Sequence, residues 1–271
     1  MLKKLKDFAK ILAHKSVRHR VLSASNELSF RLLLALFPFI MLCFSILGFL
    51  NINSETFLDY ISDAVPEALL DIVSVFALEI METRSLGLVS LSLFIALFSA
   101  SSGFYAVIRG VNKSYDYEES RHIVVVRLLS VFLVFVFILA IASAIAVVAV
   151  NINIVYTLFS DILLSRYVMF IATFFANAIS LGMLFFTTMV IYKVASCKKV
   201  RFISVLPGAV AAVVCWVLAT KLFSVYVANF ANYSNIYGSI GGIIILMIWI
   251  NIISAAFLFG SEINSLLDVS K

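Results

Sequence analysis

The stretch Leu128–Ser160, LLSVFLVFVFILAIASAIAVVAVNINIVYTLFS, decides the fold class because it contains no charged residue. About 20 apolar residues in a helix cross the ~30 Å hydrocarbon core of a bilayer, so this stretch is long enough to span a membrane. Five further charge-free runs reach that length or fall just short of it: Leu32–Ser54, Ser85–Ile108, Tyr167–Tyr192, Phe202–Thr220 and Leu222–Ser261. The sequence therefore predicts an all-α polytopic membrane protein with six transmembrane helices.

The composition agrees with this prediction. Of 271 residues, 63% are hydrophobic and 13% are charged, whereas a soluble domain carries about 25% charged residues. We expect a cytoplasmic basic arm over residues 1–27, a membrane domain over 28–266 and a short tail over 267–271. The spans are predicted near residues 29–50, 86–108, 128–150, 167–192, 202–228 and 240–262.

The positions of Lys and Arg predict the orientation. Sixteen of the 20 lie in the N-terminal arm, in the connections after the second and fourth spans, and in the tail. The opposite side has only Arg84 and Arg166, and the remaining two fall within spans. Because Lys and Arg concentrate in cytoplasmic loops, both termini are expected to face the cytoplasm.

Two segments outside the spans are predicted to be amphipathic helices. Residues 1–22 carry Leu, Phe and Lys at helical spacing, which fits either an interfacial helix on an anionic leaflet or a solvated arm. The extracytoplasmic segment 51–85 has a carboxylate every four residues opposite an apolar side. These carboxylates are expected to face water, and a divalent-cation site is the less favoured alternative.

Seven polar residues are expected near the inner interface: Glu27, Arg31, Arg109, Asn112, Arg127, Glu262 and Asn264. Arg31 can pair with Glu27 along its helix, or with Glu262 if the first and last spans are neighbours. Ordinary snorkelling of side chains to the interface explains such a set. The sharper hypothesis is a pocket between helices that binds an anionic head group. No ionisable residue is placed at the midplane, which argues against ion-coupled transport.

The sequence gives little support to metal, cofactor or nuclease chemistry. It has three His and three Cys without paired metal-ligand spacing, and a metal-dependent nuclease needs convergent His and carboxylate ligands. The basic loops are short and are already explained by orientation. We therefore expect no catalytic site, metal, cofactor or nucleic-acid partner.

Four stretches together resemble the YihY/BrkB family of bacterial inner-membrane proteins, once labelled ribonuclease BN. They are LSFRLLLALFPF at 28–39, SSGFYAVIRGVNKSYDYEESR at 101–121, the segment from LPGA at 206–209 through Tyr226, and Tyr237–Asn264 with YGSIGG and GSEIN. Arg31 departs from the pattern, because an uncharged residue is more usual there. The resemblance is carried by Pro38, Gly103, Asn112, Tyr115, Arg121, Pro207, Tyr237, Gly238, Gly260, Glu262 and Asn264.

The resemblance implies an inner-membrane protein linked to envelope integrity, without a defined molecular activity. Combined with the polar set above, it leads to the hypothesis of a transporter or flippase for a lipid or amphiphilic anion, with membrane lipids as partners. The alternative is a non-transporting envelope protein that acts through protein partners, with the acidic segment 55–82 as the surface that contacts them. An enzyme, ribonuclease included, is not expected. The oligomeric state stays open, and a homo-oligomer is compatible with the sequence.

Overall fold

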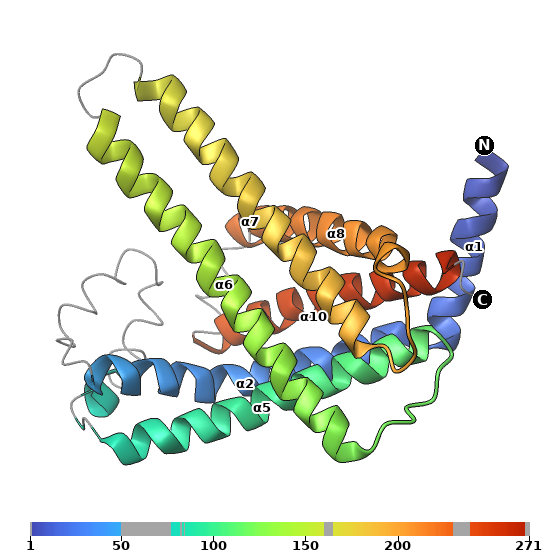
Figure 1. Ribbon diagram of the computed structural model, residues 1–271, viewed down its shortest axis with the longest axis horizontal. Coiled ribbons are helices and arrows are strands. Elements are labelled where there is room, and N and C mark those ends of the chain that lie inside the picture. The colour runs from blue at the N-terminus through green and yellow to red at the C-terminus, as the bar shows by residue number, and fades with distance from the viewer. Residues whose placement is uncertain are drawn as a thin grey trace. The chain divides into compact units, whose positions relative to one another are not determined.

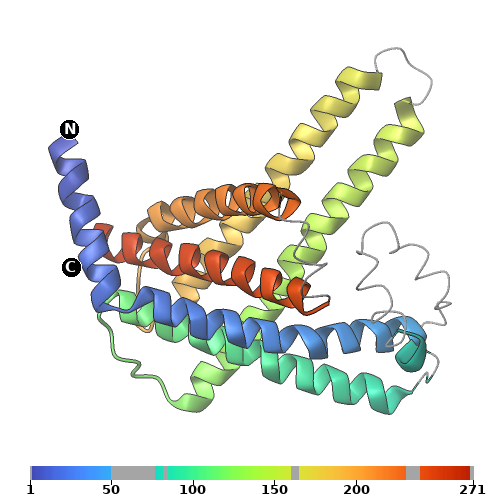
Figure 2. The same cartoon turned by 180° about the vertical axis from the view of Figure 1, so that it is seen from behind.

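The computed structural model describes residues 2–49, 77–81, 83, 85–159, 165–229 and 239–268. Within these ranges the chain is helical with short connections and has no strand, which confirms the predicted all-α fold class. Figures 1 and 2 show the elements from opposite sides. The helices are α1 (Leu2–Arg18), α2 (Val21–Phe49), α5 (Leu86–Ser114), α6 (Ile123–Phe159), α7 (Ser165–Ala195), α8 (Phe202–Asn229) and α10 (Ser239–Leu267).

All of these helices except α1 are long and apolar enough to cross a bilayer, which makes six spans in the described part of the chain. Each predicted span coincides with one of them. The main difference is at the ends, because α2 begins at Val21, α5 continues to Ser114 and α10 continues to Leu267. Charge-free runs mark only the hydrocarbon-crossing part of a helix, whereas the hydrogen-bonded helix continues into the polar region beside it.

The chain divides into two compact units, which are described separately. Unit 1 consists of Met1–Val21, Val107–Trp216 and Ala256–Lys271, and unit 2 consists of Leu22–Ala106 and Val217–Ala255. The division therefore passes through α5, α8 and α10 rather than between helices.

In unit 1, α6 and α7 pack against each other and run side by side in both views (Figures 1 and 2). Large apolar side chains on these two helices remain exposed, among them Phe132, Leu139, Phe174 and Phe186. An apolar surface of this kind is suited to contact with lipid tails, which is consistent with the predicted spans.

In unit 2, α2 packs against α5 and against the short helical stretch 77–81. Phe44 of α2 is buried with Ala77 and Met81. A Cβ atom on Gly48 would lie 2.3 Å from the carbonyl oxygen of Met81, so this close approach requires glycine. Residues 51–76 lie outside the described residues, and so does most of the acidic helical segment predicted over 51–85.

Candidate functional site

A capping turn at the end of α5 places Asp116 beside α1. The amide of Asp116 donates to the carbonyl of Lys113 at 3.1 Å, and the amide of Tyr117 donates to the carbonyl of Asn112 at 2.9 Å. These two bonds form a Schellman motif, which requires a left-handed residue just after the helix. Asp116 takes that position with φ of 55°, and Asp is among the residues that tolerate it.

The C-terminal part of α1 and the residue after it contact α10 through buried charges. The Nδ1 atom of His19 lies 2.7 Å from Oε1 of Glu262. Lys15 donates from Nζ to Oγ of Ser265 at 2.5 Å and lies 3.8 Å from Oε2 of Glu262. The Glu262 side chain is 1% exposed. A carboxylate this deeply buried is stable only beside compensating charge and hydrogen bonds, and α1 supplies both.

Asp116 joins the same group from the other side of His19. Its Oδ1 atom lies 3.0 Å from Nε2 of His19 and also accepts a hydrogen bond from Arg18. Partial burial tends to raise the pKa of Asp116, but the hydrogen bond with His19 and the positive charges of His19, Arg18 and Lys15 outweigh it and lower the pKa. We call Lys15, Arg18, His19, Asp116 and Glu262 the His19 network.

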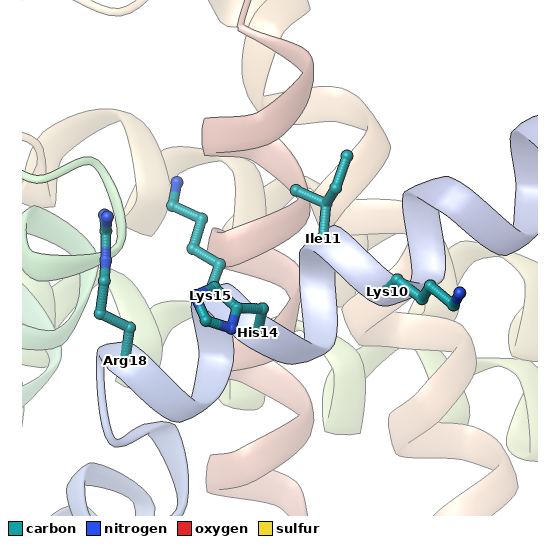
Figure 3. A pocket seen from close by; sticks show the side chains of 5 residues that line it. All are labelled: Lys10, Ile11, His14, Lys15 and Arg18. Atoms are coloured by element: carbon teal, nitrogen blue, oxygen red, sulfur yellow. The ribbon is translucent and has the colours of Figure 1, made fainter.

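A pocket of about 350 Å³ lies along α1, and Figure 3 shows its lining. The lining residues fall at one-turn and two-turn spacing, so they share one side of the helix. Four of them can carry positive charge, and the exposed Ile11 adds an apolar contact. This combination suits an anionic group attached to an apolar chain. The lining residues are Lys10, Ile11, His14, Lys15 and Arg18.

A second polar group connects the end of α5 to the end of α7. Asn112 donates to Glu119 at 2.7 Å and accepts a hydrogen bond from the amide of Cys197 at 2.8 Å. Arg121 donates to both oxygens of Glu119 and to the carbonyls of residues 194 and 195. The hydrogen bond from Arg121 is the largest influence on Glu119 and lowers its pKa. Arg121 thus satisfies carbonyls that α7 leaves open at its C-terminus.

A third group joins α8 to α10 at a close helix crossing. The amide of Gly208 donates to Oδ1 of Asn264 at 2.6 Å. A Cβ atom on Gly208 would lie 2.0 Å from the carbonyl oxygen of Gly260, and one on Gly260 would lie 2.5 Å from that of Gly208. Small residues allow helix backbones to approach in membranes. Gly208, Gly260 and Asn264 therefore determine how these two helices pack.

Unit 2 holds the remaining predicted pair. Arg31 donates to Oε1 of Glu27 from Nη2 at 2.9 Å and from Nε at 3.1 Å, and it also donates to Ser102 of α5. Of the two pairings predicted for Arg31, the one with Glu27 is present.

Comparison with known proteins identifies the family of this chain. The sequence profile of the family described as Virulence factor BrkB matches residues 12–271. The chain belongs to the BrkB family. This match covers the His19 network, the Asn112 group and the α8–α10 crossing together, and it confirms the resemblance noted in the four sequence stretches.

Relatives of this BrkB-family chain include one of similar length. The ribonuclease-like protein YfkH of Bacillus subtilis is 35% identical over 97% of this chain and 96% of its own. UPF0761 membrane proteins of Aeromonas salmonicida and Tolumonas auensis are 32% and 37% identical, over 30% and 29% of this chain and 28% and 26% of their own. No solved structure matches at a significant level. The chain is thus a multi-helix membrane protein of the BrkB type.

The seven polar residues expected near one interface are distributed over the two units. Glu262, Asn112 and Asn264 belong to three groups in unit 1, and Glu27 pairs with Arg31 in unit 2. Arg109 is exposed and Arg127 is half-buried. Of the motif residues, Gly103 packs beside Leu32, and Pro38 and Pro207 lie inside α2 and α8. Tyr237 and Gly238 lie outside the described residues.

Lys15, His19 and Asp116 were missed as site residues in this BrkB-family chain. The segment 1–22 was expected to lie on a leaflet or in solvent. Within it Lys15, Ser16 and His19 are buried, whereas Val17 and Arg18 are exposed. The available signal was the spacing of Lys15 and His19, which places both on one side of a helix. Nothing local to the sequence connects that side with Glu262.

The described ranges hold no group of three or more His, Cys, Asp or Glu placed to bind a metal ion. In the His19 network the two ring nitrogens contact different carboxylates, at 2.7 and 3.0 Å. Metal ligands instead point several lone pairs at one position. The chemistry of this network is therefore that of proton sharing and ion pairing.

Proposed function

We propose that this BrkB-family protein transports or flips an anionic lipid or another amphiphilic anion. The pocket along α1 carries the proposal, because it combines cationic side chains with an apolar one beside a buried charge network. The protein would act in the bacterial inner membrane with the α1 end facing the cytoplasm. No enzymatic activity forms part of the proposal.

The chemistry of the lining supports an anionic ligand. A guanidinium and two ammonium groups, together with His14, provide charge-assisted donors for phosphate or carboxylate oxygens. Two carboxylates offset part of this charge, because Glu262 lies beside Lys15 and Asp116 accepts a hydrogen bond from Arg18. Lys10 and His14, both exposed, contribute positive or donor character at the other end of the pocket.

The distribution of charge supports the proposed orientation. Three contacts bring helix ends together at one end of unit 1. The end of α5 meets the end of α7 through Asn112 and Cys197, α1 meets α10 through His19 and Glu262, and the start of α8 meets α10 through Gly208 and Asn264. The connections that meet there carry most of the basic residues, and basic segments favour the cytoplasmic side and its anionic lipids. A head group at the inner leaflet would then lie at the level of the α1 pocket.

Reconstituted vesicles provide the test. The full chain is placed in liposomes that contain phosphatidylglycerol with a fluorescent label on its head group. A quencher that cannot cross the membrane is added outside, and the rate at which the inner-leaflet probe becomes quenched is measured. We expect the protein to accelerate quenching, Lys10→Glu to slow it at least about fivefold, and Lys199→Gln, an exposed charge in the connection after α7, to leave it unchanged. Equal rates in protein-loaded and protein-free vesicles for both this probe and a labelled single-chain anion would refute the proposal.

A further inference from the structure

His19 occupies an unusual position, because each of its ring nitrogens faces a different carboxylate. Nδ1 lies 2.7 Å from Oε1 of Glu262, and Nε2 lies 3.0 Å from Oδ1 of Asp116. Both distances are those of hydrogen bonds. The ring is buried, and the Glu262 side chain is buried more deeply still.

The number of hydrogen atoms on the ring nitrogens restricts which protonation state of His19 fits these two contacts. A neutral imidazole has one N–H donor and one acceptor, whereas the doubly protonated ring donates from both nitrogens. Ionised carboxylates only accept. Two ionised carboxylates at hydrogen-bond distance from both nitrogens therefore match the imidazolium form. We propose that His19, Glu262 and Asp116 form a proton-binding site that locks the end of α1 onto α10 and the α5 turn.

The surrounding charges favour ionised carboxylates. From α1, Lys15 lies 3.8 Å from Glu262 and 4.0 Å from Asp116, and Arg18 donates to Asp116. Arg18 also lies 3.2 Å from Nε2 of His19; because a guanidinium only donates, Arg18 and the protonated Nε2 share Asp116 as their common acceptor. The lowered pKa of Asp116, already described, agrees with an ionised carboxylate on that side of the ring.

Loss of one ring proton would change the contact between helices. One nitrogen lone pair would then face a carboxylate oxygen across a distance set for a hydrogen bond. On the Glu262 side both side chains are buried, so little water is available to separate them. The attraction on that side becomes repulsion, and the segment Lys15–His19 loses one of its attachments to α10 or to the α5 turn. The inference therefore predicts that α1 is held firmly when the ring carries both protons and loosens when one is removed.

The inference goes beyond the proposed function and does not depend on transport. Both readouts below are taken from the full chain in nanodiscs without any added anion. A failure of transport therefore leaves this prediction in place, and a failure of this prediction leaves the α1 pocket available to a head group.

The first measurement is the protonation state of His19 itself. The chain has only three histidines, so His14→Gln combined with His122→Gln leaves a single ¹⁵N-labelled imidazole and keeps the network intact. Histidine ordinarily changes charge within the range of pH 5 to 8. We expect both ring nitrogens to carry hydrogen while α1 is docked, and one of them to lose it as the pH is raised. A docked α1 whose His19 ring is neutral, or a ring whose protonation never changes while the chain stays folded, would overturn the proposal.

The second measurement is hydrogen exchange of the α1 amides, expressed as protection factors so that the intrinsic pH dependence is removed. Protection at residues 15–18 should fall about tenfold as the ring loses its proton, because the segment then loses a charge-assisted hydrogen bond. His19→Gln should lower protection at all pH values and remove the pH dependence. His14→Gln, in the same helix but exposed, should retain the wild-type profile. Protection that stays constant while the ring loses its proton would contradict the proposal that this proton holds α1 in place.

Discussion

The two units of this protein hold their charges in different ways. In unit 2, Arg31 pairs with Glu27 one turn earlier on the same helix, and the two side chains are 33% and 40% exposed. In unit 1, Glu262 is 1% exposed and contacts His19, which is 243 positions away in the chain. Water screens the first pair and can replace either partner. The second pair is a tertiary contact whose members cannot return to water without separating α1 from α10.

Position in the chain and burial therefore determine how much a charged side chain contributes to the stability of the fold. The local pair fixes a side-chain orientation on α2 and reaches Ser102 of α5. The buried network fixes the docking of a whole helix. The predictions below test this contrast, beginning with the largest expected effect.

Glu262→Ala should be the most destabilising of these changes. It removes the buried one of the two carboxylates beside Lys15 and His19, and breaking a buried pair in this way costs about 3 kcal/mol or more. The measurement is the free energy of unfolding of the purified chain in mixed micelles. Glu118→Ala, which removes an exposed carboxylate, is the matched control and should change that free energy by less than about 0.5 kcal/mol. Equal effects would show that burial is not decisive.

Arg121→Gln should have an intermediate effect. It removes the charge-assisted bonds to Glu119 and to two carbonyls at the end of α7. We expect a loss of about 2 kcal/mol in the free energy of unfolding, with faster hydrogen exchange in the last turn of α7. Lys199→Gln, an exposed charge in the adjacent connection, should leave both unchanged. Unchanged hydrogen exchange in the last turn of α7 in Arg121→Gln would show that these carbonyls have other hydrogen-bond donors.

Acid should weaken unit 1 through Asp116 and Glu119. Both have a lowered pKa in the folded chain, so their stabilising contribution is complete above the ordinary carboxyl values near pH 4 and is lost as the pH falls through the lowered values. The measurement is Tm at pH 5.5, 4 and 3. Glu119→Gln should lose less Tm than the wild type over this range. A wild type and variant that decline in parallel would contradict a role for Glu119.

Glu27→Ala should have the smallest effect. Removing the half-exposed partner of Arg31 leaves a guanidinium that still reaches water and Ser102. We expect the free energy of unfolding to change by less than about 1 kcal/mol, and added salt to reduce the difference further. A loss as large as that of Glu262→Ala would remove the contrast between the two units.

Much of the fold could be predicted from local sequence. Charge-free runs such as Leu128–Ser160 identify spans because the bilayer sets a minimum length for an apolar helix. The pairing of Arg31 with Glu27 was among the predicted alternatives because it depends only on a spacing of four. The extension of α2 to Val21 and of α10 to Leu267 was missed because hydropathy falls before the helical hydrogen bonds end.

The candidate site could be predicted only in part. Glu262 and Asn112 were expected to be important, but their partners were not identified, because a contact between His19 and Glu262 leaves no periodic pattern in the sequence. Asp116 contributes because a left-handed capping turn brings its carboxylate beside α1. The sequence does not reveal that contact, because it depends on how α1 packs against the end of α5. Asn264 and Gly260 were noted as motif residues, and the structure adds the reason, which is the close approach of α8 to α10.

A double-mutant cycle for His19→Gln and Glu262→Gln, run beside one for Arg31→Gln and Glu27→Gln, tests the contrast most directly. Free energies of unfolding in the same micelles give the coupling of each pair. We expect a coupling free energy of about 2 kcal/mol for the buried pair and less than about 0.5 kcal/mol for the exposed pair. Couplings of equal size, or a buried pair that shows none, would contradict it.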